Sequence, residues 1–257
     1  MGTTAGYAHV NGLALYHEVA GEGFPLVLLH GGVMTIDLSF AGLIPGLVDR
    51  HRVVAVELQG HGRTADVDRE RTPASSASDV VALLDHLGVE RADVLGHSMG
   101  GEVALELAVS HPERVRRVVP MGVWVRPEGM HADLRDPARF ATSTRLPTAQ
   151  DYADMREAYT RLSPHPERFD AFFSGSSGSA AEFPGWTDAQ LAGITAPVLL
   201  VQGDHDFTTI EHAGLMLELI PGAQLAVLPG TTHMQVTRRV DLLLPIVRTF
   251  LADGAAA

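Results

Sequence analysis

A short turn between an apolar strand and an apolar helix is the feature that most constrains the fold of this chain. Gly96-His97-Ser98-Met99-Gly100 has the pattern G-x-S-x-G, follows the strand-like ADVL and opens the helix-like MGGEVALELAVS. Such a tight turn strains the backbone at Ser98, and glycine at positions 96 and 100 removes side chains that would collide with crossing elements. We therefore expect the Ser98 hydroxyl to lie above a sheet at a helix N-terminus, and we disfavour an ordinary glycine-rich loop.

Strand-like and helix-like segments alternate along most of the chain. Two alternating segments flank Asn11-Gly12, the pair that favours a type I′ turn and so an antiparallel hairpin. Compact runs rich in Val and Leu follow, as expected of parallel strands buried on both faces. The predicted strands are 7–10, 13–19, 26–29, 53–56, 92–95, 115–120, 198–201 and 225–228, and the predicted helices are 75–87, 99–110, 148–162, 166–173, 211–219 and 240–251. This order predicts an α/β fold, a doubly wound and mostly parallel central sheet with an N-terminal antiparallel hairpin and flanking helices.

One long segment, from Trp124 to Ala192, breaks this alternation. It holds six prolines, no convincing strand, and a tract of small residues at 174–181 with the composition of a flexible loop. An insertion of this length between two buried strands is usually functional. We therefore predict a core formed by residues 1–123 and 193–257, with a helical cap, residues 124–192, inserted after the sixth strand.

The composition excludes several classes of function. Lys plus Arg number 19 against 31 Asp plus Glu, so the net charge of −12 disfavours nucleic acid and anionic membranes as partners. A count of 0 Cys excludes disulfides, thiolate zinc sites and cysteine nucleophiles. The first residues lack a signal-peptide pattern, and no apolar run approaches the roughly 20 residues that span a bilayer. We expect a soluble, cytoplasmic protein that acts on a small molecule.

A serine nucleophile needs a base and an orienting carboxylate at the same edge of the sheet. Of the 13 histidines, His233 follows the last predicted strand, which puts it on the carboxyl-end rim with Ser98. Asp204 and Asp206 follow the strand at 198–201. We favour Asp206 as the carboxylate, because two positions further on the loop can turn toward the base, and we expect Asp204 to brace the loop.

The loop His30-Gly31-Gly32-Val33 follows another buried strand at that rim. We expect the backbone N–H groups of Gly32 and Met99 to form an oxyanion hole, with Val33 as an alternative to Gly32.

Other residues on the rim or in the cap are candidates for lining a pocket. We expect His30, His61 and His97 to be structural or pocket-lining. The candidate substrate contacts are His30, Val33, Trp124, Phe172, Trp186, Phe207 and Met234. The run Asp204-His205-Asp206 has no partner cluster with ligand spacing, so we expect no metal and no other cofactor.

Several of these motifs together resemble the α/β-hydrolase fold superfamily, in its capped esterase, lactonase and perhydrolase-like branch, over nearly all of residues 7–251. The matching pieces are LLHGG at 28–32, QGHGRT at 59–64, GHSMGG at 96–101, HPERVRRVV at 111–119, GDHD at 203–206 and PGTTHM at 229–234. The resemblance implies Ser98 as nucleophile, Asp206 as acid and His233 as base, in the chain order of that superfamily. Relatives that open epoxides or remove halides use Asp at the nucleophile position, so Ser98 argues against both reactions.

The resulting prediction is a serine hydrolase that cleaves a small carboxylic ester or lactone through an acyl-enzyme. One alternative is a carbon-carbon bond hydrolase or perhydrolase that uses the same triad. Another is a non-catalytic protein that keeps the pocket to bind a small molecule.

Overall fold

A computed structural model describes residues 2–174 and 183–252. Its eight strands form one sheet in the order β1-β2-β4-β3-β5-β6-β7-β8. The strands are β1 (Thr4–Val10), β2 (Leu13–Ala20), β3 (Phe24–Leu29), β4 (His51–Val56), β5 (Ala92–His97), β6 (Val115–Met121), β7 (Leu199–His205) and β8 (Gln224–Thr232). β2 pairs antiparallel with β1 and with β4, and the remaining neighbours pair parallel. The predicted hairpin and mostly parallel sheet are confirmed.

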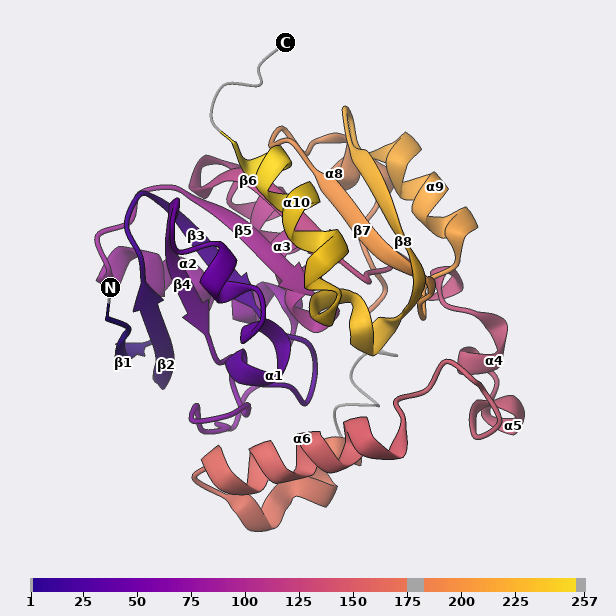
Figure 1. Ribbon diagram of the computed structural model, residues 1–257, viewed down its shortest axis with the longest axis horizontal. Coiled ribbons are helices and arrows are strands. Elements are labelled where there is room, and N and C mark those ends of the chain that lie inside the picture. The colour runs from indigo at the N-terminus through magenta and orange to yellow at the C-terminus, as the bar shows by residue number, and fades with distance from the viewer. Residues whose placement is uncertain (1, 175–182, 253–257) are drawn as a thin grey trace.

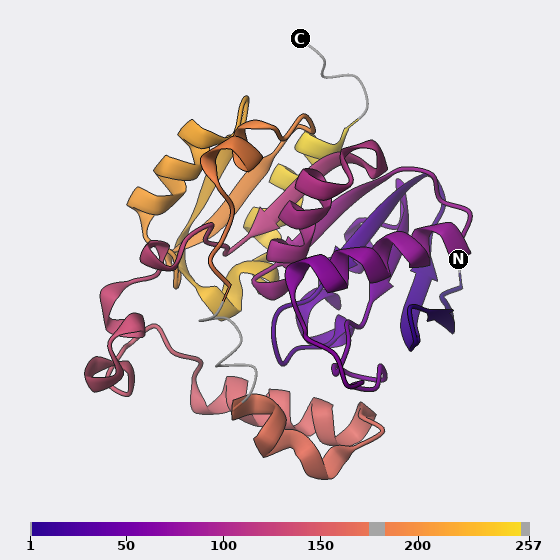
Figure 2. The same ribbon diagram turned by 180° about the vertical axis from the view of Figure 1, so that it is seen from behind.

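Helices cover both faces of this sheet (Figures 1 and 2). The α-helices include α1 (Ile36–Phe40), α2 (Pro73–His86), α3 (Met99–Ser110), α4 (Ala132–Arg135), α5 (Pro137–Phe140), α6 (Ala149–Leu162), α8 (Asp188–Ala192), α9 (Ile210–Leu219) and α10 (Val240–Leu251). α1 and α10 bury apolar side chains against one face, and α2, α3, α8 and α9 bury theirs against the other. None of the helices in the described ranges has the length and apolar content that a bilayer crossing requires.

The sheet brings distant parts of the sequence to one edge. β3, β5, β7 and β8 run parallel, so the loops that follow them emerge at the same carboxyl-end rim. β5 ends directly before Ser98, and β8 ends directly before His233, which begins the 3-10 helix η5 (His233–Arg238).

The segment predicted as a cap contributes α4, α5, α6, the 3-10 helix η4 (Pro166–Arg168) and helical residues 169–174. Figure 1 shows α6 beyond the carboxyl ends of the parallel strands, next to α1. Thr148 starts α6 by accepting a hydrogen bond from the Asp151 N–H while the Asp151 side chain accepts one from Thr148. Of the small-residue tract at 174–181, all but residue 174 lies outside the described residues.

The end of that segment packs differently from its middle. Trp186 and Leu191 are buried in the same apolar cluster as residues of β5 and α3, whereas Tyr159 and Phe169 form a separate cluster with Met34 and Met234. We propose that the cap is shorter than 124–192 and that the chain has rejoined the core by Trp186.

Candidate active site

The turn at Ser98 has the strained geometry that its sequence predicts. Ser98 has a φ of 52°, a left-handed value that is rare for a residue with a side chain. Its N–H donates to the Met121 carbonyl at 2.8 Å, which holds the turn against β6. A Cβ at position 96 would collide with the Gly100 carbonyl, and one at position 100 with the Leu29 carbonyl. Glycine at both positions therefore lets the helix start directly above the strands.

His233 and Asp206 form a buried pair. The His233 Nδ1–H donates to Asp206 Oδ1 at 2.6 Å, and both side chains are at most 3% exposed. The N–H groups of Gly203 and Phe207 also donate to the Asp206 carboxylate, at 3.2 and 2.6 Å. Burial alone would raise the pKa of Asp206, but the attraction of His233 and these hydrogen bonds outweigh it and hold the pKa below its ordinary value. The carboxylate is thus ionised beside the imidazole.

Asp204 lies two residues away and has different partners. Its carboxylate accepts hydrogen bonds from the Gly230 and Thr231 N–H groups, each at 2.9 Å, and so ties the end of β7 to β8. Phe207 stacks on the His233 ring with the two centroids 3.9 Å apart and an interplanar angle of 11°. The imidazole is therefore fixed at one edge by Asp206 and on one face by Phe207.

Ser98 and His233 line the same cavity, which has a volume of about 1390 Å³. Among the described residues, no hydrogen bond joins Ser98 Oγ to His233, and no group occupies His233 Nε2. Serine-histidine contacts of this type are often long in unliganded enzymes and tighten when substrate binds.

Two buried histidines hold the loop after β3. The Leu58 N–H donates to His30 Nε2 at 3.1 Å, and the His30 Nδ1–H donates to the Gly31 carbonyl at 2.8 Å. The Val33 N–H donates to His61 Nε2 at 3.0 Å. Val33 has a φ of 60°, and its N–H is not available to a substrate oxygen, which removes it as the alternative oxyanion donor. The Gly32 N–H has no acceptor within the described part of the chain.

His30, His61 and a third buried histidine, His97, are neutral. Burial lowers the pKa of His30 to about 4 and that of His61 well below its usual value, although each ring donates to a backbone carbonyl. Burial is the main cause that lowers the pKa of His97 to about 3, and the neighbouring His233 ring lowers it further. The His97 Nε2–H donates to the His233 carbonyl at 3.0 Å, so Nδ1 is the unprotonated ring nitrogen. This Nδ1 has no hydrogen-bond partner among the described residues.

The structure separates the predicted substrate contacts into two groups. Val33, Trp124, Phe207 and Met234 line the cavity with Ser98, whereas His30, Phe172 and Trp186 do not. His30 is fully buried and used by the loop. Trp186 donates from Nε1 to the Glu106 carboxylate at 2.7 Å and packs in the core. These two residues were mispredicted as contacts because rim position and aromatic character do not reveal which way a side chain faces.

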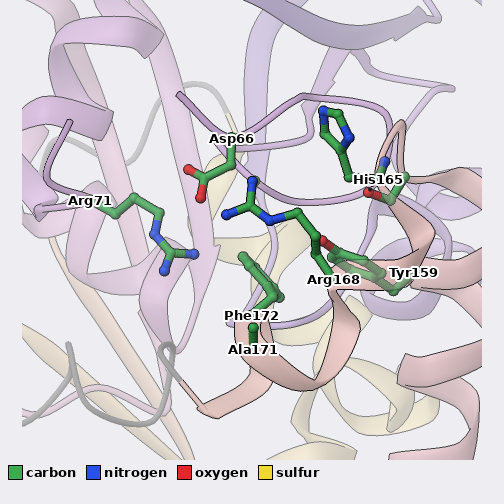
Figure 3. Close-up of a pocket in the computed structure, with 9 residues that line it drawn as sticks. Asp66, Arg71, Tyr159, His165, Arg168, Ala171 and Phe172 are labelled. Atoms are coloured by element: carbon green, nitrogen blue, oxygen red, sulfur yellow. Dashed lines mark hydrogen bonds between the residues drawn. The ribbon is translucent and has the colours of Figure 1, made fainter. Parts of the chain in front are cut away.

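Phe172 lines a smaller pocket of about 100 Å³ between the cap and the loop after β4. Figure 3 shows the Arg71 and Arg168 side chains reaching this pocket from opposite sides, with Asp66 between them. The Arg71 guanidinium lies 4.8 Å from the centre of the Phe172 ring, and Asp66 accepts a hydrogen bond from Gln59 at 2.8 Å. Phe172 therefore packs between cap and core and does not face Ser98.

Glu102 is one of several polar residues in the cavity wall that the sequence analysis did not identify. It lies in the first turn of α3 and lines the cavity with Ser98. The available signal was a charged residue in the otherwise uncharged stretch MGGEVAL at 99–105, directly after the turn. No cluster of three or more His, Cys, Asp or Glu side chains within residues 2–174 and 183–252 is arranged to hold a metal ion.

Comparisons with known proteins agree with this architecture. The family model for the alpha/beta hydrolase fold matches residues 25–159. A 2-hydroxymuconate semialdehyde hydrolase of Pseudomonas sp. (strain CF600) is 30% identical over 258 residues, which cover 93% of this chain and 90% of the relative.

Two solved structures are similar over almost the whole chain. An enol-lactonase from Burkholderia xenovorans LB400 has a TM-score of 0.76 and 25% identity, covering 95% of this chain and 99% of that one. Est816, described as an N-acyl homoserine lactone degrading enzyme, has a TM-score of 0.71 and 26% identity, covering 95% and 100%. With its sheet order, its Ser98 turn and these matches, the chain belongs to the α/β-hydrolase fold family.

Proposed function

We propose that this chain is a serine hydrolase that cleaves a small-molecule carboxylic ester or lactone, with Ser98 as nucleophile, His233 as base and Asp206 as the orienting carboxylate. The observation that carries the proposal is that His233, hydrogen-bonded to the buried Asp206, lines the same cavity as Ser98, a serine with a φ of 52°. The enol-lactonase and the lactone-degrading enzyme among the similar structures support an ester-type bond.

The first half-reaction would transfer the acyl group to the protein. Ser98 Oγ attacks the carbonyl carbon while His233 Nε2 takes the hydroxyl proton, and Asp206 stabilises the imidazolium that forms. The negative charge moves to the carbonyl oxygen, where the Gly32 and Met99 N–H groups donate hydrogen bonds. Met99 is the first residue of α3, so its N–H has no acceptor within that helix. Collapse of the tetrahedral intermediate breaks the bond to the leaving oxygen, which takes the proton from His233.

The second half-reaction would return the free serine. Water gives a proton to His233 Nε2 and attacks the acyl carbon, and the ester bond to Ser98 breaks as Oγ recovers that proton. The products are a carboxylic acid and an alcohol, or one hydroxy acid when the substrate is a lactone. No step requires a metal or an organic cofactor, and we expect full activity after exhaustive chelation.

A fluorophosphonate probe tests the assignment directly. We expect an adduct on the peptide that contains Ser98, loss of labelling in Ser98→Ala, and hydrolysis of short p-nitrophenyl esters by the unmodified protein only. An active enzyme that carries no adduct at Ser98 would contradict the proposal. Binding of esters without turnover would instead favour the non-catalytic alternative.

Carbon-carbon bond hydrolysis is the second candidate, because the relative at 30% identity is named a 2-hydroxymuconate semialdehyde hydrolase. The same site would serve that reaction, with a ketone carbonyl in place of the ester carbonyl. Kinetics on a vinylogous 1,5-diketone and on an ester of similar size, each with Ser98→Ala as control, would separate the two. A kcat/KM at least tenfold higher on the diketone would favour this candidate.

A further inference from the structure

Helix α3 carries two glutamates one turn apart, and their surroundings differ. Glu106 is half-buried and accepts hydrogen bonds from Trp186 Nε1 at 2.7 Å and from Ser110 Oγ at 2.5 Å. Glu102 is 9% exposed, and its carboxyl has no hydrogen bond or ion pair within the described residues. Residues four apart lie on the same side of a helix, so Glu102 and Glu106 form one stripe, and the Glu102 N–H donates to the Ser98 carbonyl at 2.9 Å at the start of the helix.

Glu102 also differs from Glu106 in what it faces. It lines the cavity that Ser98 and Met99 line, whereas Glu106 does not. With a rise of 1.5 Å per residue, a position four residues along a helix lies about 6 Å further along the axis. A substrate whose carbonyl carbon is at Ser98 Oγ would therefore pass close to Glu102.

The Glu102 carboxyl is largely shielded from bulk water, is open only to the cavity and has no partner within the described part of the fold. Removing a carboxyl group from water without a replacement hydrogen bond is unfavourable, and buried polar groups are normally paired. Charged residues do line the same cavity, namely Asp66, Asp68, Arg69, Glu70, Arg71, Arg135 and Arg168. None of them forms an ion pair with Glu102, and Arg69 is paired with Asp79. The carboxyl is thus neither balanced by a cation nor used by the fold.

We propose that Glu102 is a substrate-binding residue that donates a hydrogen bond to a carbonyl or hydroxyl oxygen of the substrate, a few atoms away from the ester group that Ser98 attacks. Burial raises the pKa of Glu102 to about 8, so that the carboxyl is protonated at neutral pH and has a hydrogen to donate. The inference rests on the proposed function and narrows its substrates to esters or lactones that carry a further carbonyl or hydroxyl oxygen a few atoms from the reacting group.

Matched pairs of esters test the inference. One pair is p-nitrophenyl hexanoate and p-nitrophenyl 5-oxohexanoate, and the other is hexyl acetate and 5-oxohexyl acetate. The distant ketone changes polarity without changing the reacting bond. In at least one pair, we expect the ratio of kcat/KM, oxo over plain ester, to fall about tenfold in Glu102→Leu. Glu102→Gln keeps an N–H donor, and we expect its ratio within about threefold of the unmodified protein.

The melting temperature Tm is a second readout, because Tm would fall in Glu102→Leu if Glu102 had a structural role. Because Glu102→Leu removes an unpaired polar group from a buried site, we expect Tm to rise by about 3 °C. Glu106→Gln is the matched control on the same helix, and we expect it to lower Tm and leave both ester ratios unchanged.

Three results would overturn the inference. The first is a ratio that is equal in the unmodified protein and in Glu102→Leu for both pairs. The proposed function would still be supported in that case, provided that the plain esters are cleaved only when Ser98 is present. A lower Tm with equal loss on all esters would make Glu102 a structural residue. A preference for an aminoalkyl ester that Glu102→Gln abolishes would assign an ionised carboxylate in place of the donor. Failure of every ester would remove the proposed function itself.

Discussion

The carboxyl-end rim of the sheet and the cap are held together by different kinds of interaction. At the rim, directional hydrogen bonds fix the loops, such as those from the Leu58 N–H to His30 and from His233 to Asp206. In the cap, α6 is held mainly by apolar and aromatic contacts, such as the edge-on packing of Tyr159 against Phe169 with centroids 5.5 Å apart. Hydrogen bonds require one geometry, whereas apolar packing tolerates changes in shape.

This difference suits the two parts of the proposed function. Reacting groups must be held to a fraction of an ångström, and a directional network at the rim can do that. A cap that packs through apolar side chains can change its inner surface without disturbing the reacting groups. An ion pair between Arg238 Nη1 and Asp151 Oδ1, at 2.6 Å, joins the two regions by linking η5 to the start of α6. We therefore expect rim substitutions to affect all substrates and cap substitutions to affect some.

The strongest test of this division is Ser98→Ala. Removal of the nucleophile should lower kcat by about 10⁴- to 10⁶-fold on every ester, because no other described group is positioned to attack the carbonyl. Steady-state kinetics on small and bulky esters measures the effect, and an unchanged Tm confirms that the fold is intact. A loss confined to one class of ester would contradict the division of roles between the rim and the cap.

The next largest effect is expected at Asp206, directly after β7, and not at Asp204, near the end of that strand. Asp206→Asn should lower kcat by about 10⁴-fold, because an amide cannot both stabilise the imidazolium and keep the required tautomer. Asp204→Asn is the matched control. It leaves the His233 contact intact and weakens hydrogen bonds to the Gly230 and Thr231 N–H groups, so we expect less than about a tenfold loss. The reverse ranking would exchange the roles of the two residues.

Cap substitutions should change the order of substrates. Leu134 and Leu146 line the cavity from the cap. Their replacement by Ala enlarges it, so the ratio of kcat/KM for bulky over small esters should rise about tenfold. Phe169→Ala is the control, because Phe169 is buried in the cap cluster and does not line the cavity. It should lower the free energy of unfolding by about 3 kcal/mol and leave the ratio unchanged. An equal decrease in kcat/KM on all esters in Leu134→Ala would mean that the cap does not determine substrate selectivity.

The same contrast explains what could be predicted from the sequence. All eight strands are predictable: continuous apolar runs such as LVLL at 26–29 mark the parallel strands, and alternating segments around Asn11-Gly12 mark the hairpin. The turn at Ser98 is predictable because its constraints are local, in the glycines beside it. Helices α1, α4, α5 and α8 were missed, since four or five residues are too few to display helical periodicity.

Side-chain direction is the part of the site that sequence does not reveal. Phe172 and Phe173 are adjacent, yet only Phe173 lines the cavity with Ser98, because Phe172 packs between Tyr159 and His61. Glu102 escaped notice for a related reason. A glutamate on a helix usually faces water, and only the packing of α3 against its neighbours turns this one toward a cavity.

The smallest expected effect concerns how stability depends on pH in the two regions. The pKa of His30 is about 4 in the folded protein, against about 6.5 when the chain is unfolded. Between these values the unfolded state binds the extra proton, so His30 contributes stability that is complete above pH 6.5 and is lost as the pH falls toward 4. His30→Gln removes this dependence, and the decrease in Tm from pH 7 to pH 4.5 should be smaller by about 5 °C. Phe169→Ala has no titrating group to remove and should lower Tm by a similar amount at every pH. Parallel Tm curves for His30→Gln and the unmodified protein would mean that His30 is not buried as a neutral ring, and that the hydrogen-bonded rim is looser than its geometry indicates.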